Sequence, residues 1–487
     1  MTKTLLFIVV GLTLSLHAAS AVRQNSRKPL VLTDCQPARI PGPAKCGTLE
    51  VYENRATKKG RKISLNILLL PATGDKREPD PVVYFAGGPG SAATEDAVGF
   101  APEFAKIREH RDLLFVDQRG TGKSHPLNCK FYDPNDLQSY LGYFFPLEDV
   151  RNCRTQLEAI ADLKLYTTDI AIDDMDEVRA ALGYDKLNLF GGSYGTRAAL
   201  TYLKRYPQHV RTATLQGVAP PNEYMPGEFP LHNERALNGV IAECAADEAC
   251  NKAFPNLKEE AKALLDQLTK EPVEVEVEKP ETKERVKVKL SRDLMAEAIR
   301  YMMYSPVPAS RVPLIIHLAA QGNFVPLTRT ALQYRKFLVG SDSNGMYLSV
   351  TCAEDLPWIK PGEGERMGAN TFLGDYRLRQ QREACALWPR GEVRRDYAAP
   401  LRADVPVLIL TGEWDPVTPP SNGDAIAKGL KNSLHIVVPH GAHGLGGLEN
   451  IDCIQRLTAD FVERGTTKNL DTSCVKTIRR KGFALKL

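Results

Sequence analysis

Short apolar runs that alternate with helix-like segments are the feature that most limits how this chain can fold. In the first half of the chain these runs occupy residues 63–70, 81–86, 112–117, 186–190 and 212–218. Before the fourth run, Met175, Val178 and Leu182 follow the spacing of a helix with one buried face, and a glycine stands where that helix would end. The alternation of strands and helices predicts the α/β class, which is a mostly parallel sheet with helices on both faces.

A segment of different character interrupts this pattern. After the Ala-Pro-Pro at 219–221 the sequence has long amphipathic stretches, and sheet-type runs return only at 405–412 and 435–441. The simplest organisation is one α/β domain that carries a mainly helical lid. We therefore predict a signal peptide at 1–21, core segments at 22–219 and 401–487, and a lid insertion at 220–400.

Two parts of the insertion have a clear local pattern. The amphipathic stretch 251–269 predicts one long helix. At 273–277 valine alternates with glutamate, and at 285–290 valine and leucine alternate with arginine and lysine. This pattern predicts a hairpin in which an acidic strand pairs with a basic one. Such paired charges are typical of a solvated surface rather than of a binding patch.

The N-terminus has the features of a secretory signal peptide. One lysine precedes an apolar run at 5–16, and the small residues Ala19 and Ala21 follow, which predicts cleavage after Ala21. The apolar run is too short to span a bilayer comfortably, and no cysteine follows that could carry a lipid. We expect a secreted or periplasmic protein without a membrane anchor.

The cysteines indicate an oxidising compartment. All ten lie beyond the predicted signal peptide, and their number is even. No CxxC pair occurs, so we expect no metal site built from them. Sequence alone does not fix the connectivity, but the spacing favours five local bridges, namely Cys35–Cys46, Cys129–Cys153, Cys244–Cys250, Cys352–Cys385 and Cys453–Cys474.

The stretch LFGGSYGTRAAL has the most informative spacing for chemistry. Gly191, Ser193 and Gly195 give the pattern G-x-S-x-G between a predicted strand and a predicted helix. A serine on such a sharp turn needs small neighbours, and it stands above the positive end of the following helix. This context favours Ser193 as a nucleophile over a glycine-rich turn without a function.

A serine nucleophile needs a base, and the base needs a carboxylate that orients it. In this type of site the chain order is Ser, then Asp or Glu, then His. We prefer Asp415 to Glu413 because the proline after Asp415 fixes a turn that presents the side chain. We prefer His443, which lies in a glycine-flanked loop, to His440, for which a structural hydrogen bond is expected. No nearby Glu or Cys completes a metal site with these two histidines.

Acyl transfer also needs N–H donors for the developing oxyanion. We expect one donor from the backbone of Tyr194, directly after the nucleophile. The second is expected from Gly88 in the stretch YFAGGPGSA, where glycines let the chain approach a substrate closely.

Two other function classes are disfavoured by the sequence. The stretch DQRGTGKSH ends like a phosphate-binding loop, but Asp117 stands where such a loop needs its first glycine, and a carboxylate there would repel phosphate. A net charge of +4 without a block of lysine and arginine gives no footprint for nucleic acid. We therefore expect neither a nucleotide nor a nucleic-acid partner.

Five motifs, in this order, resemble those of the secreted α/β-hydrolase peptidases related to proline iminopeptidase and tripeptidyl aminopeptidase: AGGPG (86–90), DQRGTGKS (117–124), GGSYG (191–195), GEWDPVTP (412–419) and GAHG (441–444). The resemblance covers both predicted sheet-bearing segments. It implies the α/β-hydrolase fold with a helical lid, cleavage of peptides from a free N-terminus, and no cofactor. Where such enzymes carry His before the GGPG turn, this chain has Phe85 and Ala86.

The resemblance also implies roles for two further groups. Asp117 and Arg119 are expected to form a partly buried pair that fixes their loop near the site. The lid of this family carries carboxylates that bind the free amine of the substrate, and a buried ammonium group does need an acidic partner. We choose Glu354, in SVTCAEDLPW beside a predicted disulfide, and a solvated acidic turn is the alternative.

These expectations combine into an exported serine aminopeptidase that removes one to three residues from peptides with a free N-terminus by way of an acyl-enzyme. A secreted carboxylesterase with the same triad is the nearest alternative, because ester and amide hydrolysis differ mainly in the substrate anchor. A catalytically silent binding protein on the same fold is the alternative from another class.

Overall fold

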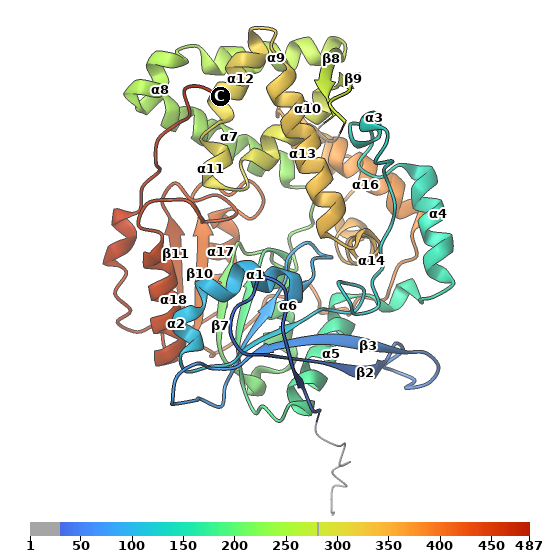
Figure 1. The fold of residues 1–487 in the computed structure, drawn as a ribbon, viewed down its shortest axis with the longest axis vertical. Helices are drawn as coiled ribbons and strands as arrows, with labels where there is room; N and C mark the ends of the chain where they lie inside the picture. Colours follow the sequence, from blue (N-terminus) through green and yellow to red (C-terminus); the bar gives the residue numbers. More distant parts are fainter. Residues whose placement is uncertain (1–29, 280–281) are drawn as a thin grey trace, which may run out of the picture.

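The computed structural model describes residues 30–279 and 282–487, so the predicted signal peptide at 1–21 lies outside the described residues. A nine-stranded sheet with the order β1-β2-β3-β5-β4-β6-β7-β10-β11 forms the lower part of the molecule in Figure 1. Its strands are β1 (Thr33–Cys35), β2 (Ala44–Tyr52), β3 (Lys62–Leu70), β4 (Val82–Phe85), β5 (Leu113–Val116), β6 (Leu187–Gly192), β7 (Val210–Gln216), β10 (Val407–Gly412) and β11 (Ser433–Val438). Neighbouring strands from β5 to β11 are parallel, whereas β1, β2, β3 and β5 pair antiparallel. The predicted mostly parallel sheet is confirmed.

The central strands are apolar on both faces because helices cover both. Every residue of β4, β5 and β10 is buried. One face packs against α1 (Ala93–Glu103), α2 (Ala105–Arg108) and α18 (Asp452–Arg464). The other face packs against α5 (Thr168–Ala181), α6 (Tyr194–Arg205) and α17 (Pro420–Ala427). As predicted, α5 stops before Gly183, whose φ of +80° lies in the left-handed region that favours glycine.

Between β7 and β10 the chain forms a layer of helices, which lies above the sheet in Figure 1. These helices are α7 (Phe229–Ala246), α8 (Glu248–Ala253), α9 (Leu257–Lys270), α10 (Arg292–Met302), α11 (Pro306–Ala309), α12 (Val312–Ala320), α13 (Val325–Ser341), α14 (Asn344–Glu354), α15 (Glu363–Gly368) and α16 (Tyr376–Leu387). The prediction of one long helix at 251–269 is wrong. Two helices form there because Pro255 lacks a backbone N–H and disfavours a helical conformation of Phe254.

The predicted hairpin of acidic and basic strands is confirmed. β8 (Val273–Glu278) pairs antiparallel with β9 (Arg285–Leu290). Ion pairs join Lys287 to Glu274 at 2.8 Å and Arg285 to Glu276 at 3.2 Å across its exposed face. These charges are therefore partnered within the hairpin.

Two segments from outside 220–400 also pack in the helical layer. α3 (Leu137–Tyr140) contacts α13, and α4 (Leu147–Glu158) contacts α14 and α16. The C-terminal tail returns to the same layer, where the backbone N–H of Ala484 donates to the carbonyl of Ser310 at 3.1 Å. Figure 1 shows the C-terminus beside α8 and α12. The layer over the sheet is thus built from three parts of the chain.

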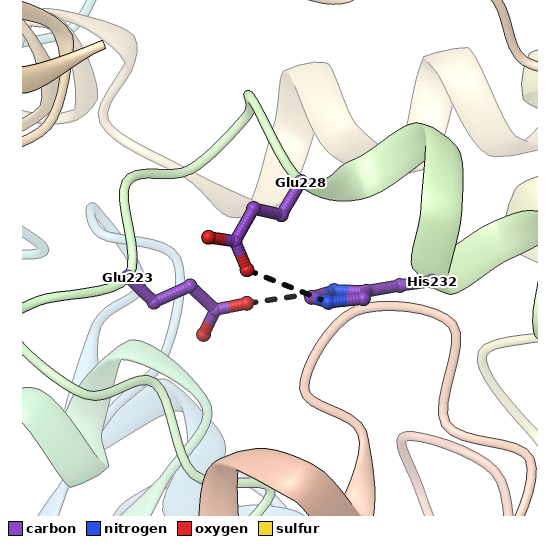
Figure 2. A group of neighbouring side chains, drawn as sticks. All are labelled: Glu223, Glu228 and His232. Carbon is purple, nitrogen blue, oxygen red and sulfur yellow. Dashed lines mark ion pairs between the residues drawn. The ribbon is translucent and has the colours of Figure 1, made fainter. Parts of the chain in front are cut away.

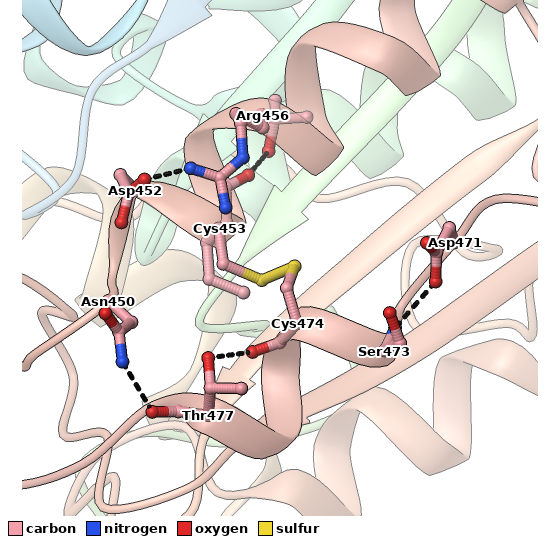
Figure 3. Close-up of a disulfide and its surroundings, with 10 residues drawn as sticks. Asn450, Asp452, Cys453, Arg456, Asp471, Ser473, Cys474 and Thr477 are labelled. Atoms are coloured by element: carbon pink, nitrogen blue, oxygen red, sulfur yellow. Dashed lines mark hydrogen bonds and ion pairs between the residues drawn. A yellow bond between two sulfur atoms is a disulfide. The ribbon is translucent and has the colours of Figure 1, made fainter.

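All five predicted disulfides are present, with Cα–Cα distances between 5.2 and 5.9 Å. The bridge between Cys453 and Cys474 joins α18 to the C-terminal tail (Figure 3), and Asn450 adds a 2.8 Å hydrogen bond to the carbonyl of Thr477 beside it. No free cysteine occurs in residues 30–279 and 282–487. This pattern fits an oxidising compartment.

Asp117 and Arg119 are both fully buried, but they do not pair with each other. Asp117 accepts hydrogen bonds of 2.9 Å from the backbone of Thr94 and from the side chain of Asn66. Arg119 donates to both carboxylate oxygens of Asp174, at 2.6 and 2.9 Å. The predicted pair is therefore wrong, because α1 and α5 supply each residue with its own partner. The loop is scaffold that ties the end of β5 to these two helices.

Candidate active site

Ser193 forms the turn between the end of β6 and the start of α6, with φ of +55° and ψ of −126°. This left-handed conformation is costly for a residue with a side chain and is found at functional turns. The neighbouring glycines are required by space. A Cβ at Gly195 would lie 1.9 Å from the carbonyl oxygen of Phe85, and one at Gly191 would lie 2.4 Å from the carbonyl oxygen of Gly195. The G-x-S-x-G spacing therefore reflects a strand-to-helix turn packed tightly against β4.

Asp415 and His443 follow the next two strands and form a hydrogen-bonded pair. Asp415 lies after β10 and His443 after β11, and Nδ1 of His443 is 2.9 Å from Oδ2 of Asp415. Asp415 is completely buried. Burial alone would raise the pKa of Asp415, but the charge and hydrogen bond of His443, with further hydrogen bonds, lower it below the ordinary value. The carboxylate therefore stays ionised beside the imidazole.

Thr418 is a third member of this group that sequence reasoning missed. Its backbone N–H donates to Oδ1 of Asp415 at 2.8 Å, and its hydroxyl donates to Oδ2 at 2.7 Å. The backbone N–H of Val417 also donates to Oδ1, at 2.8 Å. A threonine three residues after an aspartate in a turn was the available sequence signal. These donors hold the carboxylate in one orientation toward His443.

Ser193 and His443 line one cavity of about 600 Å³ between the sheet and the helical layer. Gly88 lines the same cavity, and Tyr194 begins α6 directly after the serine. The glycine-rich loop comes so close that a Cβ at Gly87 would lie 3.4 Å from Cβ of Ser193. Much of the remaining wall comes from α7, α10, α13, α14 and α16. The structure thus brings the serine, the histidine and the glycine-rich loop to one site.

Glu354 does not reach this cavity, although the sequence favoured it as the amine-binding residue. The side chain is 1% exposed, and its carboxylate is occupied by protein groups. Thr168 donates to it from the backbone at 2.6 Å and from the hydroxyl at 2.7 Å, and the hydroxyl of Tyr397 donates at 2.6 Å. We attribute the mismatch to the direction of the side chain, which points from α14 toward α5 rather than toward the cavity.

Two other carboxylates, Asp96 and Asp342, line the cavity beside the glycine-rich loop. The hydroxyl of Ser91 donates to Asp342 at 2.6 Å, and the hydroxyl of Tyr84 donates to Asp96 at 3.3 Å. Burial raises the pKa of Asp342 to about 6 and that of Asp96 to about 7, against these hydrogen bonds. No pattern in the sequence marked either residue, because nothing local shows which side chains of α1 or of the lid face the cavity.

His440 belongs to a separate network centred on Glu243 of α7. Nδ1 of His440 and Nε1 of Trp414 each lie 2.7 Å from Oε1 of Glu243, and Nε of Arg480 donates to Oε2 at 2.8 Å. The backbone N–H of His440 donates to Glu413 at 2.9 Å. Glu243 therefore joins the helical layer to both loops of the Asp415–His443 pair and to the C-terminal tail.

We expect Glu243→Ala to lower the free energy of unfolding by about 2–3 kcal/mol, because it leaves several partly buried donors without an acceptor. Denaturant unfolding measures this loss. Glu248→Ala is the matched control, since Glu248 is an exposed glutamate on the next helix and its loss should change stability by less than about 0.5 kcal/mol. Equal stability of the two variants would contradict the role of Glu243.

Two groups of described residues have three potential metal ligands within reach of one another, namely Glu223, Glu228 and His232, and Glu243, Glu413 and His440. In the first group, shown in Figure 2, the two carboxylates lie 3.4 and 3.6 Å from the imidazole nitrogens. Nδ1 of His232 is also 3.1 Å from the carbonyl of Val417, and burial lowers the pKa of His232 to about 4. In the second group Arg480 already supplies a cation. Both groups are explained as contacts that hold the loop carrying Asp415.

Comparison with known proteins agrees with this geometry. The family model described as the alpha/beta hydrolase fold matches residues 80–446. The serine protease Hip1 of Mycobacterium tuberculosis is 27% identical over 92% of this chain and 91% of its own length. The tripeptidyl aminopeptidase of Streptomyces lividans is 25% identical over 94% of this chain and 88% of its own length. The chain therefore belongs to the α/β-hydrolase family, and it is a serine hydrolase of that family.

Proposed function

We propose that Ser193, His443 and Asp415 are the catalytic triad of an exported aminopeptidase, which removes one to three residues from peptides with a free N-terminus. The observation that carries this proposal is the hydrogen bond between buried Asp415 and His443, which lines the same cavity as a serine held at φ of +55°. Peptide substrates are supported by the names of the relatives, a serine protease and a tripeptidyl aminopeptidase.

The proposed triad would carry out acyl transfer in the following steps. His443 takes the proton from the hydroxyl of Ser193 as that oxygen attacks the scissile carbonyl, and it then donates the proton to the leaving amine. Asp415 accepts from Nδ1 of His443, so the Nε2 side of the ring is free to act as the base. Water then attacks the acyl-enzyme through the same base, and Ser193 is restored.

The oxyanion would be held by backbone N–H groups of Tyr194 and Gly88. Tyr194 is the first residue of α6, so its N–H belongs to the positive end of the helix dipole. Gly88 lines the cavity, and its neighbour Gly87 lies against Ser193. Both donors are part of the backbone and are fixed before the substrate arrives.

We assign recognition of the free amine to Asp342, with Asp96 beside it. Among the described residues that line the cavity, these two are the carboxylates. Asp342 is joined to the glycine-rich loop, because Ser91 donates to its carboxylate and the backbone N–H of Ser343 donates to Gly90 at 3.0 Å. An ammonium group in this enclosed space needs such a partner.

We expect Asp342→Asn to lower kcat/KM for free-amine peptide anilides about 10- to 100-fold, because one charge-assisted contact is lost. Since burial raises the pKa of Asp342 to about 6, wild-type kcat/KM for these substrates should fall as the pH drops below about 6. Asp342→Asn should remove this part of the pH profile. Glu95→Gln, an exposed neighbour of Asp96, is the control and should retain it. An unchanged profile in Asp342→Asn would exclude this assignment.

Mass spectrometry of the products of a ten-residue peptide tests the proposed function. We expect serial release of short fragments from the N-terminus and no reaction of the N-acetylated peptide. Internal cuts in both peptides would identify an endopeptidase. Turnover of N-blocked esters with both peptides left intact would identify an esterase, and no turnover of either class would support a silent binding protein.

Export is supported by the predicted signal peptide at 1–21 and by the five disulfides. In the described part of the chain, none of the helices has the length and apolar character to cross a membrane. We expect the N-terminus of the exported protein to be Val22.

A further inference from the structure

A buried guanidinium group lies in the wall of the active-site cavity without a carboxylate partner. Arg377 of α16 lines the cavity and is 3% exposed. Its Nη2 donates to the hydroxyl of Tyr347 at 3.2 Å, but its Nε and Nη1 have no hydrogen-bond partner among the described residues. The guanidinium carbon lies 3.6 Å from the centre of the Phe144 ring. Within the described residues, no carboxylate oxygen lies within ion-pair distance of Arg377.

A second arginine, Arg300 of α10, extends this cationic region toward the catalytic histidine. Its Nη2 donates to the hydroxyl of Tyr304 at 2.6 Å, and the ring of Tyr304 packs edge-on against His443 with 5.2 Å between centres. Arg300 is 2% exposed and lies 4.4 Å above the ring of Phe229. A single tyrosine therefore separates this guanidinium group from the imidazole.

The acidic groups around the two arginines do not balance them. Among the described residues, Glu297 forms an ion pair with Arg300, with 3.5 Å between its Oε1 and Nη1 of Arg300. Asp96 and Asp342 belong to the wall beside the glycine-rich loop, where they contact Tyr84 and Ser91. The wall formed by α10 and α16 is therefore positive, and the wall beside the glycine-rich loop is negative.

Resting on the proposed function, we propose that Arg377, assisted by Arg300, binds a carboxylate of the peptide substrate. A buried cation without an anion is unfavourable, and a substrate carboxylate in the cavity would compensate it. The planar guanidinium group offers several N–H donors in a geometry that matches a carboxylate, and Phe144 beneath it limits its movement. The cavity then selects peptides with a negative group near the scissile bond.

Two parts of a peptide carry this chemistry, an acidic side chain in the acyl part and the terminal carboxylate of a short leaving part. Matched substrates distinguish them. Ala-Glu-Ala and Ala-Gln-Ala anilides test the side chain, and Ala-Ala-Ala-Ala with a free or an amidated C-terminus tests the terminal carboxylate.

In at least one of the two pairs, we expect wild-type protein to prefer the member that carries the carboxylate. Arg377→Gln should lower this preference, which is the ratio of the two kcat/KM values, about 10- to 100-fold. Arg377→Lys, which keeps the charge but loses the fork geometry, should retain part of it. Arg335→Gln is the matched control. Arg335 also stacks on Phe144, at 4.7 Å, but it donates to the carbonyl of Gly142 and is absent from the cavity wall, so the preference should persist.

Equal use of both members of each pair by wild-type protein, or an equal loss in Arg377→Gln and Arg335→Gln, would overturn the proposal. A second readout needs no turnover: the dipeptide Ala-Glu should slow fluorophosphonate labelling of Ser193 more than Ala-Gln does, and Arg377→Gln or Arg377→Lys should reduce the difference. Labelled protein that cleaves neither anilide, yet shows this difference, would contradict the aminopeptidase function while keeping the carboxylate site. Cleavage of the free-amine substrates with no preference within either pair, and no difference in labelling, would contradict the carboxylate site while keeping the aminopeptidase function.

Discussion

We expect Ser193→Ala to reduce kcat/KM for free-amine peptide anilides by about 10⁴- to 10⁶-fold, with the fold retained. The large loss follows because no acyl-enzyme can form without the hydroxyl, and only binding and the oxyanion donors remain. Fluorophosphonate labelling should disappear in the same variant. Steady-state kinetics and intact-protein mass spectrometry measure the two effects.

Ser305→Ala is the matched control for this loss. Ser305 lines the same cavity but does not lie on the strand-to-helix turn. The kcat/KM of Ser305→Ala should therefore stay within about threefold of wild type. Similar thermal unfolding of both variants would show that the loss is chemical. An active Ser193→Ala protein would refute the proposed nucleophile.

Asp415→Asn should lower kcat/KM by about 10⁴-fold, because the hydrogen bonds around residue 415 allow only one orientation of the amide group. Oδ1 of Asp415 accepts from the two backbone N–H groups of Val417 and Thr418, so the amide oxygen must take this place. The amide NH₂ then faces Nδ1 of His443, whereas the hydroxyl of Thr418 can rotate. The imidazole is forced to carry its proton on Nε2, where it cannot accept one from Ser193.

Two further variants place this loss on the Asp415–His443 pair. Thr418→Val removes one hydrogen bond to the carboxylate and should cost about three- to tenfold in kcat/KM. Glu413→Gln changes the rival carboxylate, which accepts from the backbone of His440, and should have a smaller effect than Asp415→Asn. Should Glu413→Gln cause the larger loss, the assignment of the orienting carboxylate would be wrong.

The apolar runs at the centre of the sheet were visible in the sequence because both faces of those strands are buried. β2 was missed because it lies near the edge and mixes Lys45, Gly47 and Glu50 with apolar residues. The antiparallel pairing of β1, β2, β3 and β5 was not predictable either, since pairing depends on which strands become neighbours in space. The break between α8 and α9 had a local signal in Pro255 that helical periodicity obscured.

Within the site, residues fixed by local backbone geometry were predictable, and residues brought in by packing were not. Gly191, Ser193 and Gly195 form one turn, and Asp415 and His443 each follow a strand. Their positions after predicted strands therefore indicated that they lie at the same edge of the sheet. The partners of Asp117 and Arg119, the direction of Glu354 and the cavity-facing position of Asp342 depend on how distant helices pack. A single sequence carries no such information about packing between distant segments.

The central claim is most directly tested by the release of anilide from Ala-Ala-Pro-anilide and its N-acetylated counterpart, measured with purified wild-type protein. We expect the free-amine substrate to be cleaved at least about 100-fold faster, because only its ammonium group can pair with the carboxylates of Asp342 and Asp96. Equal rates for the two substrates would contradict recognition of a free N-terminus and would leave a serine hydrolase of a different specificity.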